Sequence, residues 1–127
     1  MNFPQSYQYT KSHEWVLFLA DGTAKIGLTD YAQDQLGDLV FVNLPMVEDP
    51  VTAGEAFGDV ESVKAVADVL SPVTGKVCQI NEALLDAPES INSDPYGAWF
   101  IQVEGIEEKE ELLDAFAYEA YLRTLGD

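Results

Sequence analysis

The chain has 127 residues, with 6 Lys and Arg against 23 Asp and Glu, so its formal net charge is −17. This length is typical of one domain, and a 47% hydrophobic and 11% aromatic content is enough to build a core. The charge repels phosphate backbones and anionic lipid, which excludes general nucleic-acid binding and attachment to a membrane surface. The single cysteine, Cys78, excludes an internal disulfide framework and any metal site built on several cysteines.

The N-terminal residues Met1–Ser6 do not resemble a targeting segment. They contain no basic region, no apolar run before a cleavage site and no arginine. No apolar stretch of the sequence approaches the ~20 residues that a membrane-spanning helix needs. We therefore expect a monomeric, cytoplasmic protein of bacterial type with no membrane partner; a mature mitochondrial form stays open as an alternative.

The first half of the chain predicts three strands and one short helix. Two runs of aliphatic and aromatic residues flank an Asp-Gly pair, a strong hairpin signal because both residues can adopt a positive φ. A helix-capping side chain and a glycine then bracket a short amphipathic segment. In chain order, these are the strands Trp15–Leu19 and Lys25–Leu28 around Asp21-Gly22, a helix from Thr29 or Asp30 to Gly37, and the strand Leu39–Val42.

The second half predicts strands followed by a C-terminal helix. Gly54–Ile80 consists of short apolar runs with no 3.6-residue period, which favours strands and turns. Residues 81–97 have a loop composition, and Trp99–Val103 is the final predicted strand. The acidic residues that follow suit a helix N-terminus, so we predict a helical extension from about residue 107 to Gly126. Its apolar stripe, at four-residue spacing, is Leu113, Ala117, Tyr121 and Leu125.

Conventional catalytic machinery has no candidate residues. His13 is the only histidine, so no metal site can be built on paired histidines. The chain contains no Gly-x-Ser-x-Gly elbow and no Gly-x-Gly-x-x-Gly or Walker-type phosphate loop. Cys78 lies in a strand-like run, where we expect a small buried core residue rather than a reactive thiol. The sequence therefore predicts a protein that is not an enzyme and binds no metal.

Lys64 is the basic residue in the most unusual setting. It lies between two strand-like runs, with acidic residues at positions 59, 61 and 68. A lysine at a turn between two strands presents its amine to solvent on a rigid support, which is what a covalent tethering point requires. The other interpretation is an ordinary surface lysine paired with Glu61 or Asp68, an interaction that contributes less than ~1 kcal/mol. Local residues leave both interpretations open.

The residues around Lys64 resemble a known attachment motif. Glu61–Ala65 is similar to the lipoyl-attachment motif of lipoyl domains, and most of the chain resembles the glycine cleavage system H proteins. The segments that carry this resemblance, in the family's order and spacing, are Ser12–Val16, Gly27–Pro45, Leu70–Gly75, Asn92–Gly97, Leu112–Ala115 and Tyr118–Leu122. One departure is that only Ala98 separates Gly97 from Trp99, where the family usually has an acidic residue and a glycine.

The resemblance implies a mainly β fold. This is the lipoyl/biotinyl-type β-sandwich, or barrel-sandwich hybrid, with a short internal helix and a C-terminal helix. A single lipoyl-carrier domain would then span residues 1–127.

The resemblance also implies a cofactor and its site. Lipoate would be attached through an amide to Lys64. Glu61, three residues before it, and Gly75, eleven residues after it, would mark the folded hairpin for lipoyl-attaching enzymes. The arm would rest in a cleft that shelters its cationic load. The matching cleft residues are Glu14, Asp68 and Ser12, with Ser12 as a hydrogen-bond acceptor. The alternative for both acids is ordinary solvation, as for most carboxylates.

The activity implied by the resemblance is that of a carrier in glycine cleavage. The arm would receive the aminomethyl group of glycine from a pyridoxal-phosphate-dependent glycine decarboxylase and pass it to a tetrahydrofolate-dependent aminomethyltransferase. A dihydrolipoyl dehydrogenase would then reoxidise it. These partners and the cofactor would carry out the bond-making, bond-breaking and redox steps. A charge of −17 would speed docking to a partner with a basic cleft.

Three alternatives to this function remain. A biotinyl domain usually flanks its lysine with methionines, whereas Val63 and Ala65 flank Lys64 here. An H-like protein could instead act as a lipoyl donor or relay in lipoate metabolism. An enzyme could use Lys64 for Schiff-base chemistry, but acidic neighbours would favour the charged amine.

Overall fold

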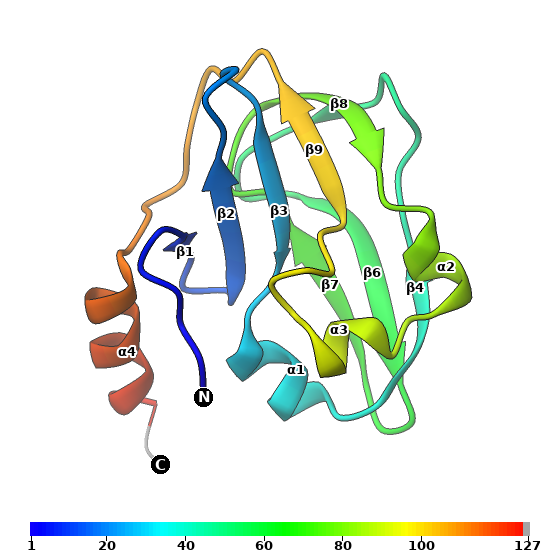
Figure 1. Ribbon diagram of the computed structural model, residues 1–127, viewed down its shortest axis with the longest axis vertical. Helices are drawn as coiled ribbons and strands as arrows, with labels where there is room; N and C mark the ends of the chain where they lie inside the picture. The colour runs from blue at the N-terminus through cyan, green and yellow to red at the C-terminus, as the bar shows by residue number, and fades with distance from the viewer. Residues whose placement is uncertain (126–127) are drawn as a thin grey trace.

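The computed structural model describes residues 1–125, which form two antiparallel sheets and several short helices (Figure 1). The strands are β1 (Gln8–Tyr9), β2 (Glu14–Phe18), β3 (Ala24–Leu28), β4 (Leu39–Asn43), β5 (Pro50–Val51), β6 (Ala56–Ser62), β7 (Val66–Leu70), β8 (Gly75–Ile80) and β9 (Ile101–Glu104). One sheet has the order β1-β2-β3-β9-β8-β5, and the other has the order β4-β6-β7. The predicted mainly β sandwich is confirmed.

The β2–β3 hairpin forms as predicted, but its turn is built differently. Of the Asp-Gly pair, only Gly22 has a positive φ, of 88°. Asp21 instead uses its side chain: Oδ1 accepts hydrogen bonds from the backbone N–H of Thr23 at 3.0 Å and from the Thr23 hydroxyl at 2.6 Å. The aspartate therefore stabilises the turn by side-chain hydrogen bonding rather than by its own backbone conformation.

The predicted internal helix, α1 (Asp30–Leu36), has both expected ends. The Thr29 hydroxyl accepts a hydrogen bond from the N–H of Ala32 at 3.1 Å, and Gly37 follows the helix with a φ of 81°. The loop predicted for residues 81–97 is wrong in part, because it contains α2 (Ala83–Asp86) and α3 (Ser90–Ser93). Each of these helices has four residues, too few to show a helical period, and together they place Leu84 and Ile91 in the core.

The C-terminal helix, α4, begins at Ala115 and not near residue 107, and it ends at Arg123. The acidic segment before it is extended and pairs with neighbouring backbone. The N–H of Glu107 donates to the carbonyl of Thr74 at 3.0 Å, and the N–H of Glu110 donates to the carbonyl of Pro72 at 2.7 Å. Carboxylates three and four residues apart would repel one another on a helix, which favours this extended course.

Asp114 sets the start of α4, because its Oδ1 accepts a hydrogen bond from the N–H of Ala117 at 2.7 Å. The inward face of α4 carries Ala115 and Tyr118, both buried, whereas Leu125 of the predicted stripe is exposed. The predicted end at Gly126 lies outside the described residues.

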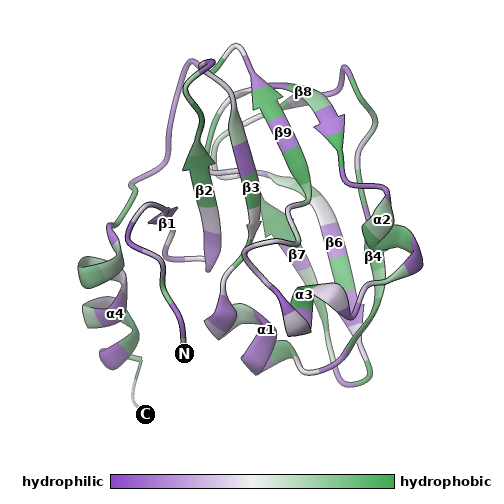
Figure 2. Cartoon of the chain, viewed as in Figure 1, coloured by the Kyte–Doolittle hydropathy of each residue, from purple (hydrophilic) through white to green (hydrophobic). Residues whose placement is uncertain are grey.

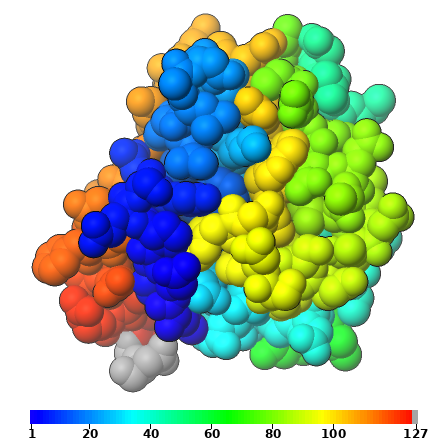
Figure 3. Space-filling model, viewed as in Figure 1, coloured from blue at the N-terminus to red at the C-terminus, as the bar shows by residue number. Residues whose placement is uncertain are grey.

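The core lies between the two sheets. Bands of hydrophobic and hydrophilic residues alternate along β6 and β9, as strands with one inward face require (Figure 2). The fully buried aliphatic and aromatic side chains of this core include Val16, Ile26, Val60, Val69, Val77, Phe100, Ile101 and Val103. A second, aromatic cluster formed around Tyr9, Trp15 and Tyr118 joins α4 to β1 and β2. The N-terminal segment lies between α4 and the rest of the molecule (Figure 3).

Cys78 is half-buried rather than fully buried as predicted, because it lies at an irregularity in the β8–β9 pairing. Its Sγ donates to the carbonyl of Gln102 at 3.4 Å, and burial raises the pKa of the thiol.

Among residues 1–125, no helix has the length and apolar character needed to span a membrane.

Candidate functional site

Lys64 lies in the tight turn between β6 and β7, and Ser62 holds this turn together. The N–H of Ser62 donates to the carbonyl of Ala65 at 2.8 Å. Its hydroxyl accepts from the N–H of Ala65 at 3.0 Å and from the N–H of Lys64 at 3.3 Å. The backbone of the lysine is therefore fixed by its own turn, while Val63 and Lys64 are exposed.

The Lys64 side chain forms no ion pair with Glu61 or Asp68; within residues 1–125, the ion pairs involve Lys11 and Lys76. It lies instead beside Gly37, at the C-terminal end of α1. A Cβ built on that glycine would lie 3.3 Å from Cε and 3.9 Å from Nζ of the lysine. The amine is therefore accessible and unpaired with any of the described carboxylates, which argues against the surface-pair interpretation.

A cavity of about 270 Å³, here called the α1 pocket, is lined by residues of α1, β6 and β7, the strands on either side of the turn that holds Lys64. Its wall reaches Leu36, the neighbour of Gly37. The apolar lining residues are Leu28, Ala32, Leu36, Val60 and Ala67, and the polar ones include Ser12, His13, Glu14 and Asp68. The three cleft residues expected from the sequence are thus brought together in one pocket. An apolar wall with a few convergent polar groups is typical of a ligand site.

Among the polar residues that line the α1 pocket, Glu14 alone is buried, with 1% of its surface exposed. Its Oε1 accepts hydrogen bonds from the hydroxyls of Thr10, at 2.8 Å, and Ser12, at 2.5 Å, and its Oε2 accepts from the N–H of Leu70 at 3.2 Å. Burial raises the pKa of Glu14 even though these hydrogen bonds oppose the shift. Glu14 is therefore not an ordinary solvated acid, whereas Asp68 is exposed.

We expected Ser12 to accept a hydrogen bond, and in the structure its hydroxyl donates one to Glu14.

His13 was not among the residues expected in the site, yet it lines the pocket, with a φ of 76°. The His13 Nδ1 lies 2.9 Å from the hydroxyl of Tyr118, which lies 2.9 Å from the hydroxyl of Thr29. No local sequence signal could predict this chain of hydrogen bonds, since His13 and Tyr118 are 105 residues apart.

The direction of each hydrogen bond among Thr29, Tyr118 and His13 follows from the other contacts of Thr29. The Thr29 oxygen already accepts from the N–H of Ala32, and within the described residues the Tyr118 oxygen is the acceptor available to its proton. Tyr118 then donates its own proton to Nδ1 of His13, which assigns the neutral ring proton to Nε2. Burial lowers the pKa of His13, in keeping with this neutral form.

The two residues expected to guide lipoylation lie far apart. Glu61 is exposed on β6, one residue before the turn that holds Lys64. Gly75 begins β8, at the other end of the sandwich from the β6–β7 turn (Figure 1). A Cβ on Gly75 would lie 2.6 Å from the carbonyl oxygen of Glu104 and 2.6 Å from Val103. Close packing against β9 therefore accounts for a glycine at position 75.

Other charged groups do not form a metal centre. Within the described residues, no group of three or more His, Cys, Asp or Glu side chains is arranged to hold a metal ion.

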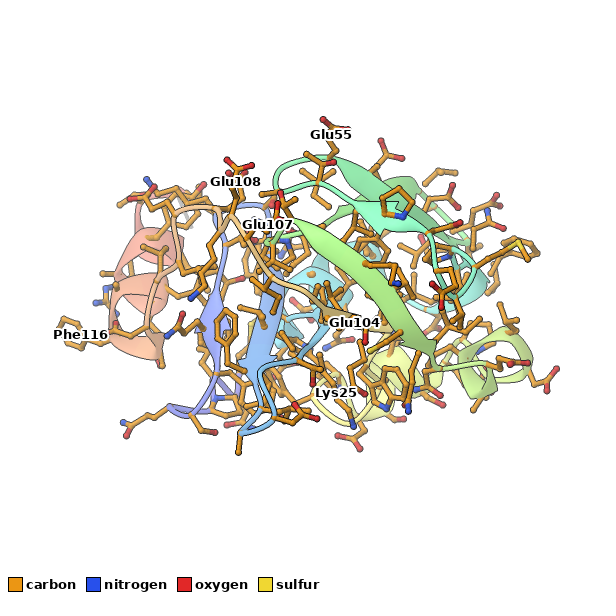
Figure 4. All side chains as sticks on the ribbon, turned by 90° about the horizontal axis from the view of Figure 1, so that it is seen from above. Lys25, Glu55, Glu104, Glu107, Glu108 and Phe116 are labelled. Atoms are coloured by element: carbon orange, nitrogen blue, oxygen red, sulfur yellow. The ribbon has the colours of Figure 1, made fainter. Side chains whose placement is uncertain are left out.

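Glu55, Glu107 and Glu108 lie along one edge of the molecule, and Phe116 points away from α4 (Figure 4).

Comparisons with known proteins cover almost the whole chain. The family model described as "Glycine cleavage H-protein" matches residues 7–125. A glycine cleavage system H protein of Lachnoclostridium phytofermentans is 57% identical over 123 residues, which are 97% of each chain. A probable glycine cleavage system H protein of Pyrococcus furiosus is 53% identical over 120 residues, 92% of this chain and 90% of that one. The crystal structure of a glycine cleavage system H protein from Mycobacterium marinum superposes with a TM-score of 0.88 at 39% identity, over 98% of this chain and 100% of that one.

Proposed function

The chain belongs to the glycine cleavage H-protein family, whose members are carriers rather than catalysts, and on this premise we propose that Lys64 carries lipoate through an amide. The observation that supports this most directly is the exposed Lys64 side chain, unpaired with any described carboxylate, on a turn fixed by Ser62 and beside the end of the helix that lines the α1 pocket. The family match leaves the biotinyl and Schiff-base alternatives without support.

The α1 pocket fits the group that the family implies. Its apolar wall suits the hydrocarbon chain and ring of a lipoyl arm, and Glu14 and Asp68 suit a cationic amine at the end of that arm. When bound, the lipoyl group supplies a disulfide that receives the aminomethyl group of glycine at one enzyme and yields it at the next.

The residues of the pocket then have separable tasks. The apolar wall excludes water from the load. Glu14 is held in place by Thr10, Ser12 and the Leu70 N–H, so its carboxylate is already oriented before an amine arrives. A cationic amine beside Glu14 would favour the ionised carboxylate and offset the cost of its burial. Asp68 adds a second carboxylate at the exposed side of the pocket.

The partners in this proposal are three enzymes. They are the pyridoxal-phosphate-dependent glycine decarboxylase, the tetrahydrofolate-dependent aminomethyltransferase and dihydrolipoyl dehydrogenase, and lipoyl-attaching enzymes prepare the carrier. The proposal places this exchange in the cytoplasm, with the carrier as a monomer. The charge of −17 would steer the carrier to basic surfaces on these partners, with a rate that falls as salt rises.

The first test is the intact mass of the protein made in cells fed with lipoate, beside Lys64→Ala made identically. We expect a gain of one lipoyl group that the variant lacks; no gain in the presence of an active ligase would refute attachment at Lys64.

The second test addresses the pocket, by measuring the half-life of the aminomethyl load on Glu14→Ala, Asp68→Ala and wild type. Both variants should lose the load faster. Glu108→Ala, at the edge of the molecule in Figure 4, is the matched control and should keep the wild-type half-life. Equal half-lives in all four proteins would exclude the sheltering role.

A further inference from the structure

The outer face of the β4-β6-β7 sheet carries exposed apolar side chains close to Lys64. Phe41 pairs across β4 and β6 with Glu61, and Glu61 pairs across β6 and β7 with Val66, so these three side chains form one row on one face of the sheet. Phe41 is 50% exposed and Val66 69% exposed, and Val63 in the turn is 84% exposed. We call Phe41, Glu61, Val63 and Val66 the β4–β7 face.

The same face also carries several carboxylates. The next row along the three strands is Asn43, Asp59 and Asp68, by the same register, and Asp68, on the edge strand β7, borders both this face and the α1 pocket. Asn43 donates an amide hydrogen bond to Asp59 at 2.6 Å. Within residues 1–125, none of Asp59, Glu61 and Asp68 is in an ion pair. Glu61 lies between Phe41 and Val66 in the first row, so a partner that covers this face would bury apolar side chains on both sides of a carboxylate. It would meet further negative charge in the next row.

We propose that the β4–β7 face is the docking surface for the enzyme that acylates Lys64, and that this enzyme presents an apolar surface with a Lys or Arg placed to meet Glu61. The inference rests on the proposed function and extends it to a named surface. An enzyme that reaches Nζ of Lys64 must cover the β6–β7 turn, and the row of Phe41, Glu61 and Val66 begins next to that turn. Exposed large apolar side chains that lie together with polar groups are typical of interaction sites.

Phe41 makes recognition depend on the folded sheet. It precedes Lys64 by 23 residues and reaches the β4–β7 face only through the pairing of β4 with β6. The chemical step itself needs little from this chain beyond presentation of the amine. The neutral amine attacks the carbonyl carbon of lipoyl adenylate, which the enzyme makes from lipoate and ATP. The C–N bond forms as the C–O bond to AMP breaks, AMP leaves with the electron pair, and the amine proton passes to water.

The test measures lipoylation rates with a purified lipoate–protein ligase, lipoate and ATP, followed by intact mass. The variants are Phe41→Ser and Val66→Ser. Their matched controls, Phe116→Ser on α4 and Val47→Ser before β5, also remove exposed apolar side chains. Urea unfolding confirms that all four variants are folded. We expect kcat/KM to fall about tenfold for the two face variants, mainly through KM, and to stay within about twofold of wild type for the controls.

The charged part of the proposal has its own readout. Rising salt should lower kcat/KM for wild type, and Glu61→Gln should reduce that salt dependence.

The outcomes separate this inference from the proposed function. If wild type is lipoylated and the face variants match their controls, the docking surface is wrong while Lys64 remains the attachment site. If wild type is not lipoylated by the active ligase, the proposed function fails and the inference fails with it. If the face variants are lipoylated normally but accept the aminomethyl group from the decarboxylase more slowly, the face belongs to that enzyme and the assignment is overturned.

Discussion

The Tyr118 hydroxyl links α4 to His13, the residue before β2, and to Thr29, the N-terminal cap of α1. It lies 2.9 Å from Nδ1 of His13 and 2.9 Å from the hydroxyl of Thr29, which caps the helix that lines the pocket. Tyr118→Phe removes this oxygen and retains the ring, which stacks on Tyr9 at a centroid distance of 4.8 Å. The variant therefore isolates the hydrogen bonds from the packing.

The expected loss of stability follows from the two hydrogen bonds. Each contributes about 1 kcal/mol net, so their removal costs about 2 kcal/mol. Thr29 is fully buried and loses the acceptor for its hydroxyl proton, which adds about 1 kcal/mol. We expect the free energy of unfolding to fall by about 2–3 kcal/mol in Tyr118→Phe.

Urea unfolding at neutral pH measures this difference as a lower midpoint at an unchanged slope. Tyr121→Phe is the matched control, because within the described residues the Tyr121 hydroxyl has no hydrogen-bond partner and the ring lies on the same helix. A loss for Tyr118→Phe no larger than that for Tyr121→Phe would refute the hydrogen-bonded chain as a stabilising link.

Three further predictions concern single residues and use the same unfolding assay. Gly58→Ala should cost about 2–3 kcal/mol, because its Cβ would collide with the carbonyl oxygen of Asn43 in the paired strand β4; wild-type stability would contradict this. His13→Asn tests a histidine whose folded pKa lies below the unfolded value of 6.5. The wild type should lose stability relative to the variant between about pH 7 and about pH 5, and parallel pH curves would exclude this cause. Asp114→Ala should cost about 1 kcal/mol through loss of the cap on Ala117, and Asp114→Asn should cost less; equal stabilities would argue against the cap.

Local chemistry predicted the elements with strong end signals. The Asp-Gly hairpin and the helix between Thr29 and Gly37 lie where the sequence places them, because capping and positive φ are properties of a few adjacent residues. The start of α4 was missed because a run of glutamates suits a helix N-terminus as well as an extended solvent-facing segment. The backbone partners on Pro72 and Thr74 that decide between these are distant in sequence.

The site was predictable to a different degree. The setting of Lys64 and the resemblance around it predicted a tether at that lysine and three of the residues that line the pocket, Ser12, Glu14 and Asp68. Neither could show that Glu14 is buried while Asp68 is exposed, since both are acids in strand-like segments. The link from His13 to Tyr118 depends on how α4 packs, so it has no signal in the local sequence.

The arrangement of the sheet edges has a consequence for behaviour at high concentration. The larger sheet ends in the two-residue strands β1 and β5, and α2 packs beside β4 at one edge of the smaller sheet. At the other edge, Glu14 accepts the N–H of Leu70 at the end of β7. The short edge strands, α2 and the Glu14 carboxylate thus leave a second chain less backbone to pair with, which limits edge-to-edge aggregation. The carboxylate proposed to meet the cargo thus also occupies a backbone group at a strand edge, so replacing Glu14 frees the Leu70 N–H for pairing with a second chain.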